Sequence, residues 1–196
     1  MHTMDPKQLS PSARKAFGLI ELDADEKLLF EVRKHWWGLF QIYFIGSFVT
    51  AVLLAIALTA AAITEDTDLG TGADLTTLRM PVIAICFLLA VFVTIVTAIA
   101  AYLYRSNVVL VTTEKVVQVL NPSLFNRKIS QLSIGDVQDV SVHQRGIFPH
   151  LLRYGTVVIE TAGEQQNYNF TYTPEPYDAS KVIVNAHEEN LKLYGN

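Results

Sequence analysis

Two long stretches of the chain contain no Asp, Glu, Lys or Arg and are dominated by Leu, Ile, Val, Ala and Phe. They run from residue 35 to 64 and from residue 80 to 104. About 20 helical residues cross a bilayer core about 30 Å thick, because a helix satisfies its own backbone polar groups where water is absent. A helix in a soluble core normally keeps a polar stripe, which these stretches lack. The pattern therefore predicts a transmembrane hairpin with spans at 39–63 and 81–103.

The flanks of the two spans carry aromatic and cationic side chains that are typical of membrane–water interfaces. These predicted interface anchors are Arg33, Lys34, Trp36, Trp37, Tyr102, Tyr104 and Arg105. The connection at 64–79 contains four acidic residues and one basic residue. Because positively charged flanks favour the cytoplasmic side, we expect a multi-pass protein of the cell (plasma) membrane. Its acidic loop is then external and both termini are cytoplasmic.

The segment that precedes the first span allows two interpretations. Residues 1–12 are polar and contain two prolines, so we expect a loose cytoplasmic tail there. Apolar residues between Leu28 and Leu39 recur at spacings of three and four, which permits one helix that runs from the surface into the first span. The alternative is a short extended piece at 27–32 that packs on the soluble domain. The sequence leaves both interpretations open.

After Arg105 the pattern changes to short runs rich in β-branched residues, separated by polar turns. Such runs are typical of antiparallel strands. We expect strands at 108–112, 115–120, 127–132, 137–142, 156–161 and 167–173. In the last of these, aromatic and polar side chains alternate, which indicates one buried and one solvated face. A hairpin turn at 162–164 connects the last two predicted strands.

The final segment changes from a period of two to the period of a helix. Pro174 and Pro176 fit the first turn, and Asp178 can cap the helix. The apolar stripe that follows consists of Ala179, Val182, Ile183, Ala186 and Leu193. We therefore expect an amphipathic helix that closes one end of a curled sheet.

Several of these pieces resemble the bacterial pleckstrin-homology-like (PH-like) domain of small membrane proteins. The pieces are 111–116, 134–137, 153–157 and the pair Pro174 and Pro176, with 26–29 and 33–36 resembling the leader that precedes the spans in such proteins. The resemblance implies a seven-stranded, strongly bent β-sandwich that is capped by a C-terminal helix and tethered to the inner membrane face. Lys115 stands where arginine is frequent in the family.

The predicted fold class is therefore an α+β membrane protein. A two-helix transmembrane hairpin is followed by a PH-like bent antiparallel β-sandwich or barrel with a C-terminal capping helix. The predicted parts are a cytoplasmic N-terminal tail and interfacial segment at 1–34, the hairpin at 35–104 and a cytoplasmic PH-like domain at 105–196.

Charge and cysteine content argue against several classes of function. The net charge of −4 argues against nucleic acid as a partner. The region 105–196 holds eight Lys or Arg against nine Asp or Glu, a balance that gives little attraction for a phosphoinositide headgroup. Contact with anionic membrane lipid in general remains, with Lys115, Arg127 and Lys128 as candidate cations. The single cysteine, Cys86, excludes an intramolecular disulfide and a zinc cluster built from cysteines.

The connection at 143–153 is apolar where a solvated loop is expected. Its candidate interaction residues are Arg145, Ile147, Phe148, Leu151 and Leu152. This loop inserts into the lipid interface, docks on a partner or folds back on the sheet. His143 and His150 lie in the same segment without a third ligand, so we expect neither a metal nor a cofactor.

The remaining residues form no catalytic motif, and the spans contain no ionisable group apart from His35 at an edge. An enzyme, a channel and a transporter are therefore disfavoured. We predict a membrane-anchored PH-like interaction module at the cytoplasmic face, which mediates protein association or oligomerisation. The alternative is a sensor of anionic envelope lipids that acts through the basic rim and the 146–152 loop. The expected partners are membrane lipids and another protein or a second copy of the chain.

Overall fold

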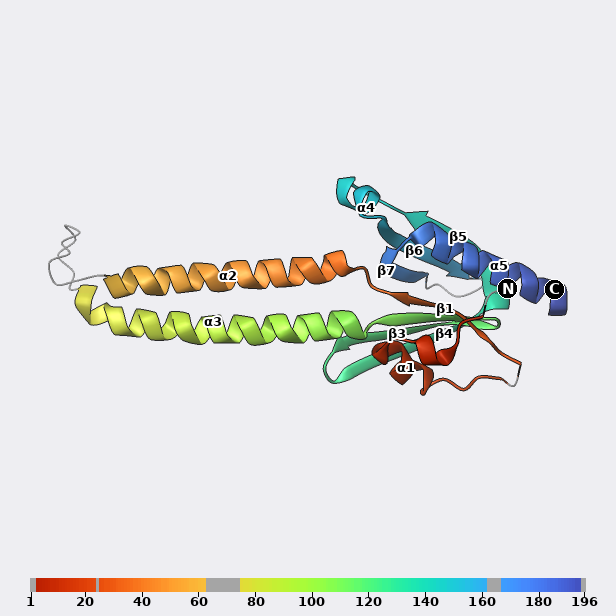
Figure 1. The fold of residues 1–196 in the computed structure, drawn as a ribbon, viewed down its shortest axis with the longest axis horizontal. Coiled ribbons are helices and arrows are strands. Elements are labelled where there is room, and N and C mark those ends of the chain that lie inside the picture. The colour runs from red at the N-terminus through yellow and green to blue at the C-terminus, as the bar shows by residue number, and fades with distance from the viewer. Residues whose placement is uncertain (1–2, 24, 63–74, 162–166, 195–196) are drawn as a thin grey trace. The chain divides into compact units, whose positions relative to one another are not determined.

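The computed structural model describes residues 3–23, 25–62, 75–161 and 167–194 and divides the chain into two compact units (Figure 1). The first, which we name the β unit, comprises Met1–Leu39 and Leu103–Asn196. The second, the helical unit, comprises Phe40–Tyr102. The chain therefore leaves the β unit once and returns to it. This division differs from the predicted one, because the N-terminal 39 residues belong to the same unit as the C-terminal strands.

Two long helices account for the predicted spans. α2 is Trp36–Ala62 and α3 is Leu75–Ser106, and both are long and apolar enough to cross a membrane. In the most apolar window of each helix only 11% of the residues are buried by the protein, so neither has the burial of a soluble core helix. A Cβ on Gly46 would collide with the Thr97 side chain, so glycine permits the close approach of α2 and α3. Most of the predicted external loop lies outside the described residues.

The β unit contains two antiparallel sheets. The strands are β1 (Leu28–Arg33), β2 (Val108–Thr112), β3 (Lys115–Ser123), β4 (Asn126–Ser133), β5 (Val137–His143), β6 (Tyr154–Thr161) and β7 (Tyr168–Pro174). One sheet has the order β1-β2-β3-β4 and the other has the order β5-β6-β7. The predicted strands from 108 onward are confirmed within a few residues at each end. Within the described part of the chain the strands form two sheets and no closed barrel, and the predicted turn at 162–164 lies outside it.

β1 pairs with β2 although both long helices separate them in the sequence. Leu28 lies opposite Thr112 and Arg33 opposite Val108. The extended interpretation of the segment before the first span is therefore confirmed, and the continuous helix is wrong. The helical spacing was misleading because consecutive apolar residues face opposite sides of the sheet, where Leu28 packs in one core and Leu29 in the other.

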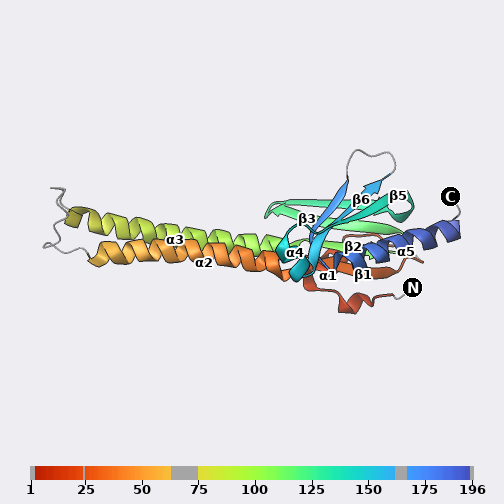
Figure 2. The same ribbon diagram turned by 90° about the horizontal axis from the view of Figure 1, so that it is seen from above.

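The inner core lies between the two sheets and is closed by α5 (Pro176–Tyr194), the predicted C-terminal helix. Its fully buried side chains include Val111, Val116, Ile134, Val157, Ile159 and Ile183. α5 packs on β5 and β6 (Figure 2). It also packs on the short helix η2 (Ile134–Asp136), which links the two sheets. Ala179, Ile183 and Ala186 of the predicted apolar stripe are thereby buried, whereas Leu193 at the end of the stripe is exposed.

A second core lies on the outer face of the four-stranded sheet. It is covered by the N-terminal segment, with η1 (Pro6–Gln8) and α1 (Pro11–Phe17). Ala13 and Ala16 of α1 are buried, and they pack in the same core as Leu110 and Val117 of the sheet. All five residues of β2 are consequently buried. The predicted loose tail at 1–12 is wrong, because Leu9 anchors this segment in the second core.

Hydrogen bonds fix this N-terminal segment. The Ser10 hydroxyl accepts the Ala13 N–H at 3.2 Å and so caps α1, while the Ser10 N–H donates to the Glu31 carboxylate of β1 at 3.0 Å. The Ser12 hydroxyl donates to the Arg105 carbonyl at 3.0 Å. The N-terminal segment is therefore hydrogen-bonded to β1, which precedes the helical unit in the chain, and to Arg105, which follows it.

Substitution of Leu110 by alanine tests the second core. Removal of a buried leucine side chain costs about 2–5 kcal/mol, because it leaves a cavity that closes only in part. We expect full-length L110A in detergent micelles to unfold at a lower temperature than the wild type and to be cleaved faster by trypsin after Arg14. The matched control is Leu193→Ala, at a side chain that is 74% exposed. Equal cleavage of the three proteins would show that α1 does not depend on this face.

Candidate functional site

Four aromatic rings meet where β1 leads into α2, and we name them the junction cluster: His35, Tyr104, Tyr154 and Tyr172. The His35 N–H donates to the Tyr172 carbonyl at 2.6 Å, so the segment just after β1 is hydrogen-bonded to β7. The His35 ring stacks on Tyr154 with centroids 5.1 Å apart, and Tyr154 stacks on Tyr172 at 5.4 Å. Tyr104 meets Tyr172 edge-on at 6.0 Å. The cluster therefore joins the end of β1, the end of α3 and both strands β6 and β7.

Two backbone features make the junction cluster possible. The Tyr104 hydroxyl donates to the His35 carbonyl at 2.7 Å, and a Cβ on Gly38 would collide with the Tyr104 ring. Only glycine at this position leaves room for that contact. Tyr172 has a φ of 57°, in the left-handed region that non-glycine residues rarely adopt. Such strain persists where the surroundings hold it, and here the stacked rings and the His35 hydrogen bond do so.

His35 is held in its neutral form. Burial lowers the pKa of His35, and a hydrogen bond with the Leu152 backbone offsets this in part. Its Nδ1 accepts the Trp37 N–H at 3.2 Å, so this nitrogen must be unprotonated. Protonation would place a second donor against that N–H and would put a charge among aromatic rings.

The predicted interface anchors divide into two groups. Arg33, Trp36, Tyr102 and Arg105 are exposed. Lys34 instead contacts β7 and the end of α3. Its ammonium donates to the Thr171 hydroxyl at 3.3 Å and lies 5.3 Å from the centre of the Tyr104 ring. Burial lowers the pKa of Lys34. Trp37 is half-buried, and its ring stacks on Phe148 at 5.1 Å.

The candidate interaction loop contains a short helix, α4 (Ile147–Leu151). Phe148 packs on Trp37, and the Gln144 side chain donates to the carbonyls of Pro149 and Tyr154, so one side of the loop is fixed to the β unit. Ile147 and Leu151 are 82% and 73% exposed on the other side. The loop therefore folds back only in part. Arg145 is exposed and Leu152 half-buried, and Arg145 and Tyr154 line an open groove of about 600 Å³.

A second cluster closes the far end of the four-stranded sheet, at the turn between β2 and β3. The Glu26 side chain is fully buried, and its carboxylate lies 2.9 Å from the Lys115 ammonium. It also accepts hydrogen bonds from the Thr112 hydroxyl and from the Asp23 N–H. Lys115 further donates to the Glu21 carbonyl at 2.6 Å. As a mostly buried partner of Glu26, Lys115 is not presented to lipid as the sequence predicted.

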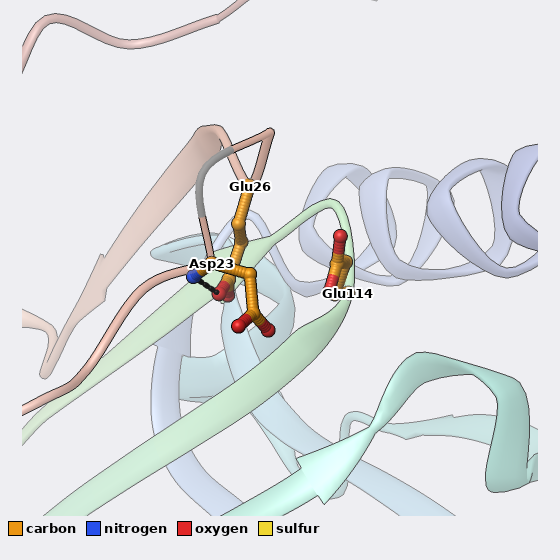
Figure 3. Close-up of side chains that lie close together, drawn as sticks. All are labelled: Asp23, Glu26 and Glu114. Atoms are coloured by element: carbon orange, nitrogen blue, oxygen red, sulfur yellow. Dashed lines mark hydrogen bonds between the residues drawn. The ribbon is translucent and has the colours of Figure 1, made fainter.

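Three carboxylates of this second cluster could be considered as metal ligands. Oxygen atoms of Asp23, Glu26 and Glu114 lie within 4.8 Å of one another (Figure 3). Glu26, however, is already neutralised by Lys115 and accepts two hydrogen bonds. Desolvation, together with the charges of Asp23 and Glu26, raises the pKa of Glu114. We therefore assign the cluster to the fold, as an ion pair with two acidic neighbours.

The pieces that carried the family resemblance come together in these two clusters. Residues 26–29 meet residues 112–115 in the second cluster, and residues 33–36 meet residues 153–155 in the junction cluster. A Cβ on Gly155 would lie within 3.0 Å of Gln144, His143 and Pro176, so glycine at the start of β6 permits a close approach to these residues. The sequence identified these pieces separately, but it did not indicate that they touch.

Two of the predicted lipid-contact cations keep an exposed position. Arg127 and Lys128 lie near the start of β4, and the Arg127 guanidinium donates to the Asn121 side chain at 3.2 Å. Both side chains are exposed, in contrast to Lys115.

The model of the protein family described as Bacterial PH domain matches residues 40–183 of this chain. The match includes most of α2, all of α3, the strands β2 to β7 and the first part of α5, and it begins after β1. Comparison with curated proteins and with solved structures found no match.

Removal of the Lys115 charge tests the second cluster. In Lys115→Met, Glu26 is left as an uncompensated buried charge, which costs about 3–5 kcal/mol in comparable cases. We expect K115M to unfold at a clearly lower temperature, whereas Lys115→Arg retains the cation and stays close to the wild type. The double variant Glu26→Gln, Lys115→Met should regain part of the lost stability. If the loss of stability in the double variant equalled the sum of the losses in Glu26→Gln and in Lys115→Met, the two side chains would not interact.

The pH dependence of stability tests the junction cluster. Because the pKa of folded His35 lies below the value of about 6.5 for an unfolded histidine, the unfolded state takes up the proton first as the pH falls. The stabilising effect of neutral His35 is complete well above pH 6.5 and is lost as the pH falls through that value. Thermal unfolding between pH 5 and 8 should therefore depend less on pH in His35→Gln than in the wild type. The control is the exposed His143→Gln; identical profiles for all three proteins would contradict the assignment.

Proposed function

Because this chain belongs to the bacterial PH domain family, we propose that it is a membrane-anchored PH-like module that acts by binding and not by catalysis. The observation that carries the proposal is the pairing of β1 with β2. The two helices of membrane-crossing length leave and enter one β unit through these adjacent strands. An anchor of this kind attaches the module to the bilayer at two points instead of one.

Charges at the ends of the helices support a cytoplasmic location of the β unit. Arg33 and Lys34 precede α2 and Arg105 lies in the last turn of α3, whereas the opposite connection is acidic in sequence. The positive-inside tendency then places the β unit and both termini on the cytoplasmic side of the plasma membrane.

Protein association is the activity that we propose for the β unit, and β4 is the element that supports it. β4 is an edge strand of the four-stranded sheet, and every residue from Asn126 to Ile129 is exposed. An exposed edge strand offers backbone donors and acceptors to another strand. Arg127 and Lys128, at the start of β4, disfavour the pairing of this part of the strand with another positively charged strand. The uncharged part at 129–133 is therefore the preferred contact. A second copy of the chain supplies the same edge in antiparallel orientation.

Lipid contact is a second candidate function, and one specific observation favours it. Ile147 and Leu151 of α4 are large apolar side chains that remain exposed although Phe148 between them packs on Trp37. In a protein at a bilayer surface, side chains of this type lie in the lipid interface.

Site-specific photocrosslinking in native membranes tests the association. A benzophenone amino acid at Gln131 of β4 should give a crosslinked product of the full-length chain, with a second copy as the expected partner. The matched control carries the same probe at Glu188, an exposed position of α5. Equal crosslinking from both positions, or none from either, would contradict association through β4. A product with a different protein would retain the binding function and replace the second copy as the partner.

A further inference from the structure

The turn between β3 and β4 exposes two large apolar side chains that no part of the fold requires. Ser123 pairs with Asn126, so Leu124 and Phe125 form the tip of the hairpin. Phe125 is 99% exposed and Leu124 is 49% exposed. An exposed Phe at the tip of a hairpin loses the free energy that burial would give it, which makes a contact outside the chain the more favourable state.

The register of the sheet places this tip at the end of the β unit to which α3 is joined. Val108, at the start of β2, lies two residues after the end of α3 and pairs with Val119 of β3. β3 runs antiparallel to β2 and continues from Val119 to Ser123, four residues beyond the start of β2. At about 3.3 Å per residue, the hairpin projects roughly 13 Å past the point where the chain arrives from α3. The end of a membrane span lies at the headgroup level, and the tip belongs to the end of the sheet that follows α3 directly in the chain.

The exposed side chains of α4 lie at the same end of the β unit. Phe148 of α4 stacks on Trp37, which is the second residue of α2, at 5.1 Å. Ile147 and Leu151 project from this helix. The β3–β4 tip and α4 therefore belong to different sheets but share the end at which β1 stops and β2 starts (Figure 1).

Both protrusions are basic as well as apolar. The stretch 119–130 around the tip contains Arg127 and Lys128 and no acidic residue. The stretch 143–154 around α4 contains Arg145 and Arg153 and no acidic residue. In a chain with a net charge of −4, two separate apolar protrusions that are both basic are typical of contact with an anionic lipid surface.

We propose that Leu124 and Phe125, together with Ile147 and Leu151, insert into the interface of the same bilayer that the helices anchor. Arg127, Lys128, Arg145 and Arg153 then lie at the level of anionic headgroups. Each sheet of the sandwich thus has its own lipid contact, and two such contacts fix the orientation of the β unit on the leaflet. This inference rests on the membrane anchoring of the proposed function, and it adds a contact that anchoring alone does not require.

Depth-dependent quenching tests the insertion in the full-length protein. In a Cys86→Ala background, single substitutions Phe125→Cys and Leu151→Cys carry a bimane label, and the protein is reconstituted in vesicles of phosphatidylcholine and phosphatidylglycerol that contain a shallow nitroxide lipid. The matched control is Leu193→Cys, an equally apolar and 74% exposed position. Leu193 lines a cavity with Thr113 and Glu114 of the β2–β3 turn, at the opposite end of the sheet.

We expect quenching at positions 125 and 151 to exceed that at 193 several-fold. Arg127→Gln with Lys128→Gln, or vesicles of phosphatidylcholine alone, should reduce the signal at 125. Quenching at 125 and 151 no greater than at 193 would overturn the inference, as would a label at 125 that is shielded by a second copy of the chain.

Alkaline extraction of the same vesicles separates this inference from the proposed function. Release of the protein would overturn the membrane anchoring itself. Protein that remains in the membrane without quenching at 125 and 151 would overturn the insertion alone.

Discussion

The antiparallel pairing of β1 with β2 is the contact on which the rest of the structure depends. β1 and β2 form a single β-hairpin, and the connection between them contains both long helices: β1 leads into α2, and α3 leads into β2. The entropy cost of closing a loop grows only slowly with its length, and helices satisfy their own backbone hydrogen bonds. A sandwich can therefore accept an insertion of this kind in a hairpin, provided that the two strands are held in register on either side of it.

The two side-chain clusters provide that register, one at each end of β1. The buried pair of Glu26 and Lys115 joins the start of β1 to the β2–β3 turn. At the other end, His35 binds the Tyr172 carbonyl and accepts the Tyr104 hydroxyl on its own carbonyl, so β7 and the end of α3 meet the same residue. A slip of β1 by one residue would break both clusters and would exchange the residues of its two buried faces.

The parts of this fold that were predicted correctly are those with a local signal. Strands β2 to β7 follow short β-branched runs, α5 follows the period of a helix, and α2 and α3 follow their apolar length. β1 has no such signal, because Leu28 and Leu29 are both buried on opposite faces, and residues 1–12, which help to cover one of these faces, have the polar pattern of a loose tail. The two side-chain clusters were less predictable than the strands and helices. A lysine in a polar turn is expected to be exposed, but the fold brings Glu26 beside Lys115 and so makes Lys115 a mostly buried ion-pair partner. Phe125 was missed because a single apolar residue in a turn forms no pattern.

Although the chain has a net charge of −4, its charged side chains are distributed unequally between the two ends of the β unit. The end next to the helices carries Arg33, Arg105, Arg127, Lys128, Arg145 and Arg153, whereas at the far end Asp23, Asp25, Glu26, Glu114 and Glu189 outnumber the cations Lys27 and Lys115. Such a distribution gives the unit an electric dipole along the strands, and an anionic leaflet attracts one end and repels the other. Under the anchoring that we propose, orientation of the β unit at the membrane would require no specific lipid pocket. The fold has instead separated its charges so that the acidic cluster serves stability at one end while cations and apolar tips remain available at the other.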